Sequence, residues 1–124
     1  MESKLKIALA QMAPVWLNRE KTLDKVISWT SDASDKGAKL VVFGEGLCPG
    51  YPFWLDRMNG SSFNSPVHKE IHAHYMDQAV CIEEGHLDSV FEVAKKKKIS
   101  IYLGIIERPF NRGGHSLYCS IIYI

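Results

Sequence analysis

The chain has 124 residues, of which 46% are hydrophobic and 23% are charged. This length suits one domain and is too short for two ordinary ones, and the composition excludes a disordered or collagen-like chain. Fifteen Lys and Arg residues nearly balance fourteen Asp and Glu residues, which gives a formal net charge of +1. We therefore expect no general affinity for nucleic acid or for anionic membranes.

The sequence predicts neither a secretory signal nor a membrane segment. Its first residues carry Glu2, Lys4 and Lys6, and Gln11 interrupts the apolar run that follows, whereas a signal peptide has an uninterrupted apolar stretch. No apolar segment is long enough to cross a bilayer. The three cysteines are odd in number and widely spaced, which argues against a disulfide framework. We expect a cytoplasmic protein.

The first part of the sequence predicts a strand, a helix and a second strand. Alternating apolar residues in 4–12 indicate the first strand. Asn18 is a helix-capping residue, and the apolar spacing after it predicts a helix over 19–36. The β-branched run 38–43 predicts a buried strand. Strand, helix and strand in this order predict a parallel βαβ unit, and hence an α/β fold.

The second part of the sequence predicts a long loop, two helices and a hairpin. The loop, 44–66, is rich in Gly, Pro, Asn and Ser, a composition typical of functional loops. Helical spacing of apolar residues predicts helices over 67–80 and 86–98. Two β-rich runs, 99–106 and 116–124, are joined by a turn signal, Asn-Arg-Gly-Gly, and predict a hairpin.

Glu45 is the strongest candidate for a catalytic residue. It lies two residues beyond the predicted buried strand, at the carboxyl edge where α/β sheets gather their ligands. The structural alternative is an ordinary turn residue or a solvated carboxylate. Tyr51, Phe53 and Trp54 follow in the same loop, where they either line a substrate pocket or seal the loop onto the core. The sequence leaves both alternatives open.

The three cysteines are weak candidates for a nucleophile. Cys48 lies three residues after Glu45, and a neighbouring carboxylate raises the pKa of a thiol unless a cation intervenes. We expect Cys81 and Cys119 to be small buried hydrophobic residues. Glu107 and Arg108 follow an apolar strand, where an internal ion pair is the structural interpretation.

His68, His72 and His74 form the pattern H-x3-H-x-H, whose first two members share a helix face. No cysteine or carboxylate at ligand spacing completes a tetrahedral set, so we expect surface histidines and no metal. The run 95–98 contains four lysines at the end of a predicted helix, where positive charge complements the helix dipole. This placement favours a solvated helix end over a nucleic-acid site.

The segment VVFGEGLCPGYPFWL resembles the first catalytic segment of the nitrilase superfamily of carbon–nitrogen hydrolases, where an acid follows a strand and precedes a Gly-Tyr-Pro loop. KIALAQMAPVWLNREKTLDKV is similar to the opening strand and helix of that family, and YLGIIERP with HSLYCSIIYI to its next hairpin. The nitrile-hydrolysing branch is the most similar. One departure is Gly44, where the family usually has Pro.

The resemblance implies the N-terminal part of a four-layer αββα sandwich, with its sheet incomplete in this chain. It also implies cofactor-free Glu-Lys-Cys chemistry, in which the carboxylate takes the thiol proton, the ammonium stabilises negative charge and the thiolate attacks carbon. By the resemblance, only Glu45 has a counterpart here, since the family's lysine and cysteine lie beyond Ile124. Because the sequence stops inside an apolar strand, we expect a single, C-terminally truncated domain over 1–124.

Two functions follow as hypotheses. The first is a hydrolase that converts a small-molecule nitrile, or an amide, to acid and ammonia through a cysteine thioimidate or acyl intermediate, with Glu45 as general base. The second is a non-catalytic fragment or degenerate homologue that only associates with partner chains. An incomplete sandwich leaves sheet edges and apolar faces exposed, so we expect the isolated chain 1–124 to form a homo-oligomer or to be poorly soluble.

Overall fold

The computed structural model describes residues 3–60, 62–111 and 115–124. Its elements, in chain order, are β1 (Ile7–Ala10), α1 (Arg19–Asp35), β2 (Leu40–Phe43), α2 (Trp54–Arg57), α3 (Pro66–Gln78), the 3-10 turn η1 (Ile82–Glu84), α4 (Asp88–Lys97), β3 (Ser100–Glu107) and β4 (Tyr118–Tyr123). The order of the predicted elements is confirmed. The short helix α2 is a correction, because it forms inside the segment expected to be a loop.

The sheet has four strands in the order β1-β2-β3-β4. β1 pairs with β2 and β2 pairs with β3 in parallel, while β3 and β4 are antiparallel. The parallel pairs confirm the predicted βαβ unit, and the antiparallel pair confirms the predicted hairpin. The turn expected at Asn-Arg-Gly-Gly, 111–114, lies mostly outside the described residues.

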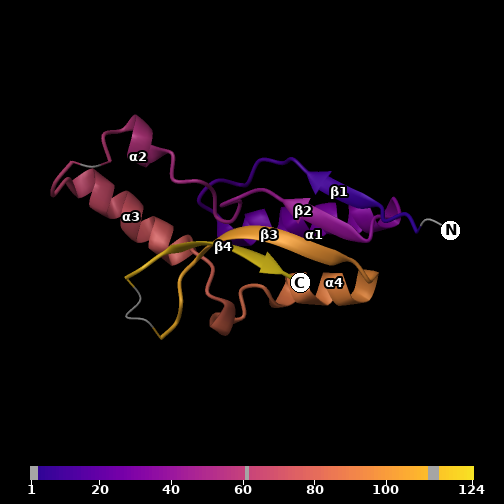
Figure 1. Cartoon of the computed structure of the whole chain (residues 1–124). Helices are drawn as coiled ribbons and strands as arrows, with labels where there is room; N and C mark the ends of the chain where they lie inside the picture. Colours follow the sequence, from indigo (N-terminus) through magenta and orange to yellow (C-terminus); the bar gives the residue numbers. More distant parts are fainter. Residues whose placement is uncertain (1–2, 61, 112–114) are drawn as a thin grey trace.

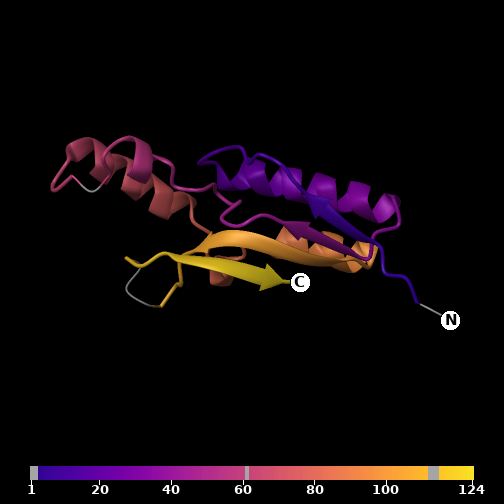
Figure 2. The same cartoon turned by 45° about the horizontal axis from the view of Figure 1, so that its top comes forward.

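Helices α1 and α4 lie side by side on one face of the sheet, and α2 and α3 project from one end of it (Figure 1; Figure 2). The side chain of Asn18 caps α1 as expected, because it accepts a hydrogen bond from the Lys21 N–H at 2.9 Å. Among the described residues, no helix is both long and apolar enough to cross a membrane.

The main core lies between the sheet and these two helices. Val26 of α1, Val90 of α4 and the β3 residues Ile101, Leu103 and Ile105 have no solvent exposure. Full burial of one such side chain stabilises the fold by about 1.5–3 kcal/mol. The core therefore holds β3 firmly at the centre of the fold, and the candidate site is built on the opposite face of that strand.

The opposite face of the sheet is largely uncovered, and we call it the bare face. Ile7 and Leu9 of β1 are 48% and 79% exposed, and Ile121 and Tyr123 of β4 are 70% and 65% exposed. The small alanines that alternate with Ile7 and Leu9 pack against the core instead. The exposed apolar sheet face expected from the sequence is therefore present.

Candidate active site on the bare face of the sheet

Glu45 lies in a short loop, residues 44–47, that leaves the sheet and returns to it. β2 ends at Phe43, and the chain rejoins the sheet at Cys48 beside β3. The Cys48 N–H donates to the Gly104 carbonyl at 3.3 Å, and the Cys48 carbonyl accepts from the Ile106 N–H at 2.8 Å. Glu45 is exposed on this loop, which we call the Glu45 loop. The expected position beyond the carboxyl end of the strand is confirmed.

Gly104 of β3 makes room for the Glu45 loop. A Cβ atom at Gly104 would lie 2.1 Å from the Gly44 carbonyl oxygen and 2.9 Å from the Glu45 Cα. Its neighbours Leu103 and Ile105 face the core, so Gly104 faces the bare side by strand alternation. The Glu45 loop therefore crosses the bare face of β3 at the one position in that strand without a side chain.

The loop brings Glu45 to Cys119 of β4. The Cys119 thiol donates a hydrogen bond to Glu45 Oε1, with a sulfur–oxygen distance of 3.4 Å. In the hairpin register, Cys119 lies opposite Ile106, two residues beyond Gly104 on the same face. The contact therefore joins a loop that follows β2 to a strand on the far side of β3.

The exposure of Cys119 corrects the expectation that this residue is a buried hydrophobe. It does share a strand face with Ile121 and Tyr123, but that face is the bare one, and the thiol is exposed. Partial desolvation and then the adjacent Glu45 carboxylate raise the pKa of the Cys119 thiol. The thiol is therefore held in its protonated form, as a hydrogen-bond donor to the carboxylate.

The aromatic residues that follow the Glu45 loop divide between core and surface. Trp54 is 3% exposed and packs edge-on against Tyr75 of α3 at 4.7 Å between ring centroids. Tyr51 and Phe53 are about half exposed, at 47% and 49%, and their rings lie 5.3 Å apart. Trp54 thus seals the segment onto α3, whereas the other two rings present apolar surface.

Two cavities adjoin these side chains. The first, about 420 Å³, is lined by Trp16, Phe53, Trp54, Arg57 and Met58. The second, about 240 Å³, lies between Trp54 and Cys119, with Tyr75 and His72 among the residues that line it. Cys119 also lines a third, polar cavity of about 440 Å³ with Glu83 and Glu107. The Glu45–Cys119 contact therefore stands beside space that a small molecule can occupy.

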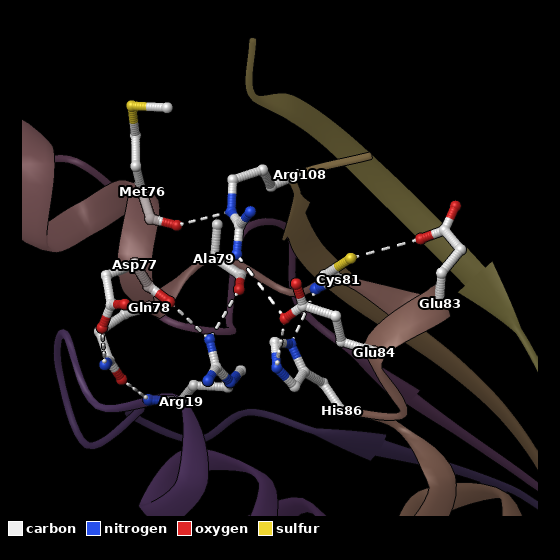
Figure 3. Close-up of polar contacts among 10 residues, drawn as sticks. All are labelled: Arg19, Met76, Asp77, Gln78, Ala79, Cys81, Glu83, Glu84, His86 and Arg108. Carbon is white, nitrogen blue, oxygen red and sulfur yellow. Dashed lines mark hydrogen bonds and ion pairs between the residues drawn. The ribbon is translucent and has the colours of Figure 1, made fainter. Parts of the chain in front are cut away.

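Arg19 fixes the position of α3, which supplies one wall of the second cavity (Figure 3). Its guanidinium donates to the carbonyls of Asp77 at 2.7 Å and Ala79 at 2.9 Å, and its backbone N–H donates to the Gln78 side-chain oxygen at 2.9 Å. The last carbonyls of a helix lack partners within the helix. Arg19 therefore satisfies the end of α3 and ties it to the start of α1.

Arg108 joins the same helix to β3 (Figure 3). Its Nε donates to the Met76 carbonyl at 3.0 Å, and its guanidinium lies 3.9 Å from the Glu84 carboxylate. Glu84 also lies 3.3 Å from His86 Nε2, while His86 Nδ1 accepts from the Cys81 N–H at 2.9 Å. The ion pair expected between Glu107 and Arg108 is therefore corrected: among the described residues, Arg108 pairs with Glu84.

His86 is held in its neutral form by this surrounding network. Desolvation, followed by the nearby positive charge of Arg19, lowers the pKa of His86 below its usual 6.5, although Glu84 and Asp77 oppose the shift and Arg108 adds to it. Its Nδ1 is a hydrogen-bond acceptor, which a protonated imidazole cannot be. His86 therefore has a structural role as a neutral acceptor.

Among the described residues, the remaining cysteines and histidines form no metal centre. Cys48 is fully buried, and desolvation raises its pKa to about 12. Cys81 is also buried, as expected, and desolvation raises its pKa. His74 Nε2 lies 3.0 Å from the Leu17 carbonyl. Across residues 3–60, 62–111 and 115–124, no group of three or more His, Cys, Asp or Glu side chains could hold a metal ion.

Comparison with known proteins identifies the family. Residues 6–124 match the carbon-nitrogen hydrolase family. An arylacetonitrilase of Aspergillus oryzae is 32% identical over 118 residues, which cover 95% of this chain and 32% of the relative. An aliphatic nitrilase of Rhodococcus rhodochrous is 31% identical over 121 residues, which cover 96% of this chain and 30% of the relative.

A solved structure supports the fold. An amidase from Nesterenkonia sp. aligns with a TM-score of 0.54 and 18% identity, covering 82% of this chain and 32% of that chain. The present chain therefore spans about a third of the length of these relatives. Its mixed four-stranded α/β fold matches part of that amidase, and the chain belongs to the carbon-nitrogen hydrolase family, the nitrilase superfamily.

Proposed function

We propose that this chain supplies the general-base segment of a hydrolase that converts a nitrile, or an amide, to the acid and ammonia. One observation carries the proposal: Glu45 is presented on the bare face by a loop that Gly104 admits, beside cavities lined by aromatic residues. A positioned carboxylate can take the proton of an attacking thiol. The nitrilase names of the two relatives described above favour a nitrile.

The reaction balances as a sequence of addition and hydrolysis. Glu45 accepts the proton of the nucleophilic cysteine that the resemblance implies, which is none of the three cysteines of this chain. The resulting thiolate attacks the nitrile carbon to form a thioimidate. Water then releases ammonia and leaves an acyl thioester, and a second water releases the acid and restores the thiol. Negative charge that develops on the substrate needs a cation, which the resemblance assigns to a family lysine that has no counterpart among these 124 residues. Phe53 and Trp54 are the proposed apolar contacts for substrate, with Tyr51 beside them.

The family also supports a proposal for the bare face. In the four-layer αββα sandwich that the resemblance implies, a second sheet packs on this surface, with a further helix layer outside it. Apolar side chains such as Leu9 and Ile121 suit sheet-on-sheet packing, in which side chains from two inner faces interdigitate. Where that second sheet is missing, we expect the face to be covered by another copy of the chain.

A specific observation favours the second function, a non-catalytic homologue that only associates with partner chains. Cys48 and Cys81 are buried, and the pKa of all three cysteine thiols is raised. Among the described residues that line the cavities beside Cys119, there is no lysine or arginine to stabilise a thiolate. The 124 residues alone are therefore expected to lack measurable hydrolysis of nitriles or amides.

The test is ammonia release from arylacetonitriles, aliphatic nitriles and amides by the polypeptide purified from its native source, together with its intact mass. We expect Glu45→Gln to lower turnover by at least about 10²-fold, because the amide is isosteric but is a far weaker proton acceptor. Glu92→Gln, which removes an exposed carboxylate from α4, is the matched control. Turnover that survives in Glu45→Gln would contradict the mechanism. An inactive polypeptide with a mass near 14.0 kDa would favour the non-catalytic function.

A further inference from the structure

We propose that Cys119 is a positioning residue for Glu45, whose thiol holds one carboxylate oxygen and leaves the other to receive the proton in the reaction. The inference rests on the proposed function of Glu45. It starts from the contact between the Cys119 sulfur and Glu45 Oε1 at 3.4 Å. The two residues are 74 positions apart in the sequence, so the tertiary fold alone creates this contact.

The backbone around both residues is fixed, so the contact is a built feature of the fold. The Glu45 loop is held at one end by β2 and at the other by the two hydrogen bonds between Cys48 and β3. Cys119 is held in β4 by its register opposite Ile106. Gly104, between these two anchors, allows the loop to pass directly over β3.

An exposed glutamate side chain has several free rotations, and ordering it costs free energy. An ionised carboxylate accepts hydrogen bonds at both oxygens, and a thiol has one proton to donate. Among the described residues, Cys119 is the donor that the structure gives to Glu45, and it engages Oε1. Oε2 can then face an incoming proton donor. A misplacement of about 1 Å in a catalytic group can lower the rate by about 10²-fold.

The same surroundings argue against Cys119 as the nucleophile. A thiolate would lie beside the Glu45 carboxylate, and like charges at this distance repel. Among the described residues, the cavity toward Trp54 offers His72 as its one basic side chain, and the cavity toward Glu83 and Glu107 offers none. The protonated thiol is therefore the stable form, and a protonated thiol is a donor.

The first test measures the alkylation of Cys119 by iodoacetamide as a function of pH in the 124-residue chain, with peptide mass spectrometry to assign the site. Cys119 is the exposed one of the three cysteines, since Cys48 and Cys81 are buried. In Glu45→Gln the adjacent negative charge is gone, so we expect alkylation near neutral pH to become about three- to tenfold faster. Glu107→Gln, which alters a carboxylate lining the same polar cavity, is the control and is expected to leave the rate unchanged.

The alkylation result decides the inference whether or not turnover is found. A rate that rises in Glu45→Gln and stays constant in Glu107→Gln supports the contact. Equal rates in the wild type and in Glu45→Gln, with both folded by circular dichroism, overturn it. Absence of hydrolysis in the native polypeptide would contradict the proposed function instead, and the two failures are therefore distinguishable.

The second test applies to any preparation that hydrolyses a nitrile. We expect Cys119→Ala to lower kcat by about tenfold or more with a smaller change in KM, since the carboxylate loses its donor but the cavity remains. Cys119→Ser keeps a donor of similar size and should restore most of kcat. A serine variant no more active than the alanine variant, or an alanine variant with wild-type kcat, would overturn the positioning role.

Discussion

Replacing Gly104 with alanine tests whether β3 makes room for the Glu45 loop. The new Cβ would lie 2.1 Å from the Gly44 carbonyl oxygen, whereas ordinary contacts begin at 3.4 Å, so the loop must move by more than 1 Å. The opposing atoms belong to the backbone and cannot rotate away. An extra carbon in a packed site costs about 1–3 kcal/mol. We expect a loss of stability in this range and displacement of Glu45 from Cys119.

Gly44→Ala is the matched control, because a Cβ at this position meets no atom within 4 Å. We expect this variant to change the free energy of unfolding by less than about 0.5 kcal/mol. Urea unfolding followed by circular dichroism measures the stability of both variants, and the alkylation rate of Cys119 reports the contact with Glu45. The reasoning would be refuted if Gly104→Ala and Gly44→Ala had equal urea midpoints and both kept the wild-type alkylation rate of Cys119. The position of the loop would then not depend on Gly104.

Two further predictions concern the network and the aromatic segment. Because the pKa of His86 is lowered, the unfolded chain binds a proton more readily than the folded one, so stability should fall as the pH drops below about 6.5. His86→Gln keeps a hydrogen-bond acceptor but cannot take up the proton, so the free energy of unfolding from urea titrations should vary less with pH in this variant. The same pH dependence in the variant and the wild type would mean that other groups cause it. Trp54→Ala should cost about 3–5 kcal/mol because the side chain is 3% exposed, whereas the half-exposed Phe53→Ala should cost much less. Equal losses in thermal unfolding would contradict this division.

Much of the fold could be predicted from the sequence because its signals are local. The capping side chain of Asn18, the β-branched run before Glu45 and the lysines that end α4 each act within a few residues. Helix α2 could not be predicted in this way. Its four residues carry no helical period, and Trp54 is held there by its contact with Tyr75 of α3, which lies 21 positions further along the chain.

The candidate site could be predicted only in part. The position of Glu45 follows from the strand that precedes it, and its role remains a prediction. Strand alternation correctly placed Cys119 on the face of Ile121 and Tyr123, but a strand's own sequence does not say which face the helices cover. The expectation of burial failed for that reason. Gly104, in the segment YLGIIERP, is a sequence signal for the path of the Glu45 loop, since a glycine inside a strand often marks a close approach of another backbone.

The bare face gives the last prediction. Leu9 and Ile121 lie at opposite edges of the sheet and are 79% and 70% exposed, and apolar surface of this kind favours association. We expect the 124-residue chain to associate with increasing concentration in sedimentation velocity experiments. Leu9→Lys and Ile121→Lys should each shift it toward monomer, because a lysine on a sheet face or edge opposes pairing.

Phe63→Lys is the control for this prediction. Phe63 is 99% exposed but lies in the segment between α2 and α3 and not in a strand of the sheet. If Phe63→Lys disperses the chain as well as Leu9→Lys does, the association depends on general hydrophobicity rather than on the bare face. A wild-type chain that stays monomeric at all concentrations would contradict the prediction altogether. Dispersal by the two sheet variants alone would mean that the chain associates through the surface that carries Glu45, because Leu9, Ile121 and the Glu45–Cys119 contact all lie on the bare face of the sheet.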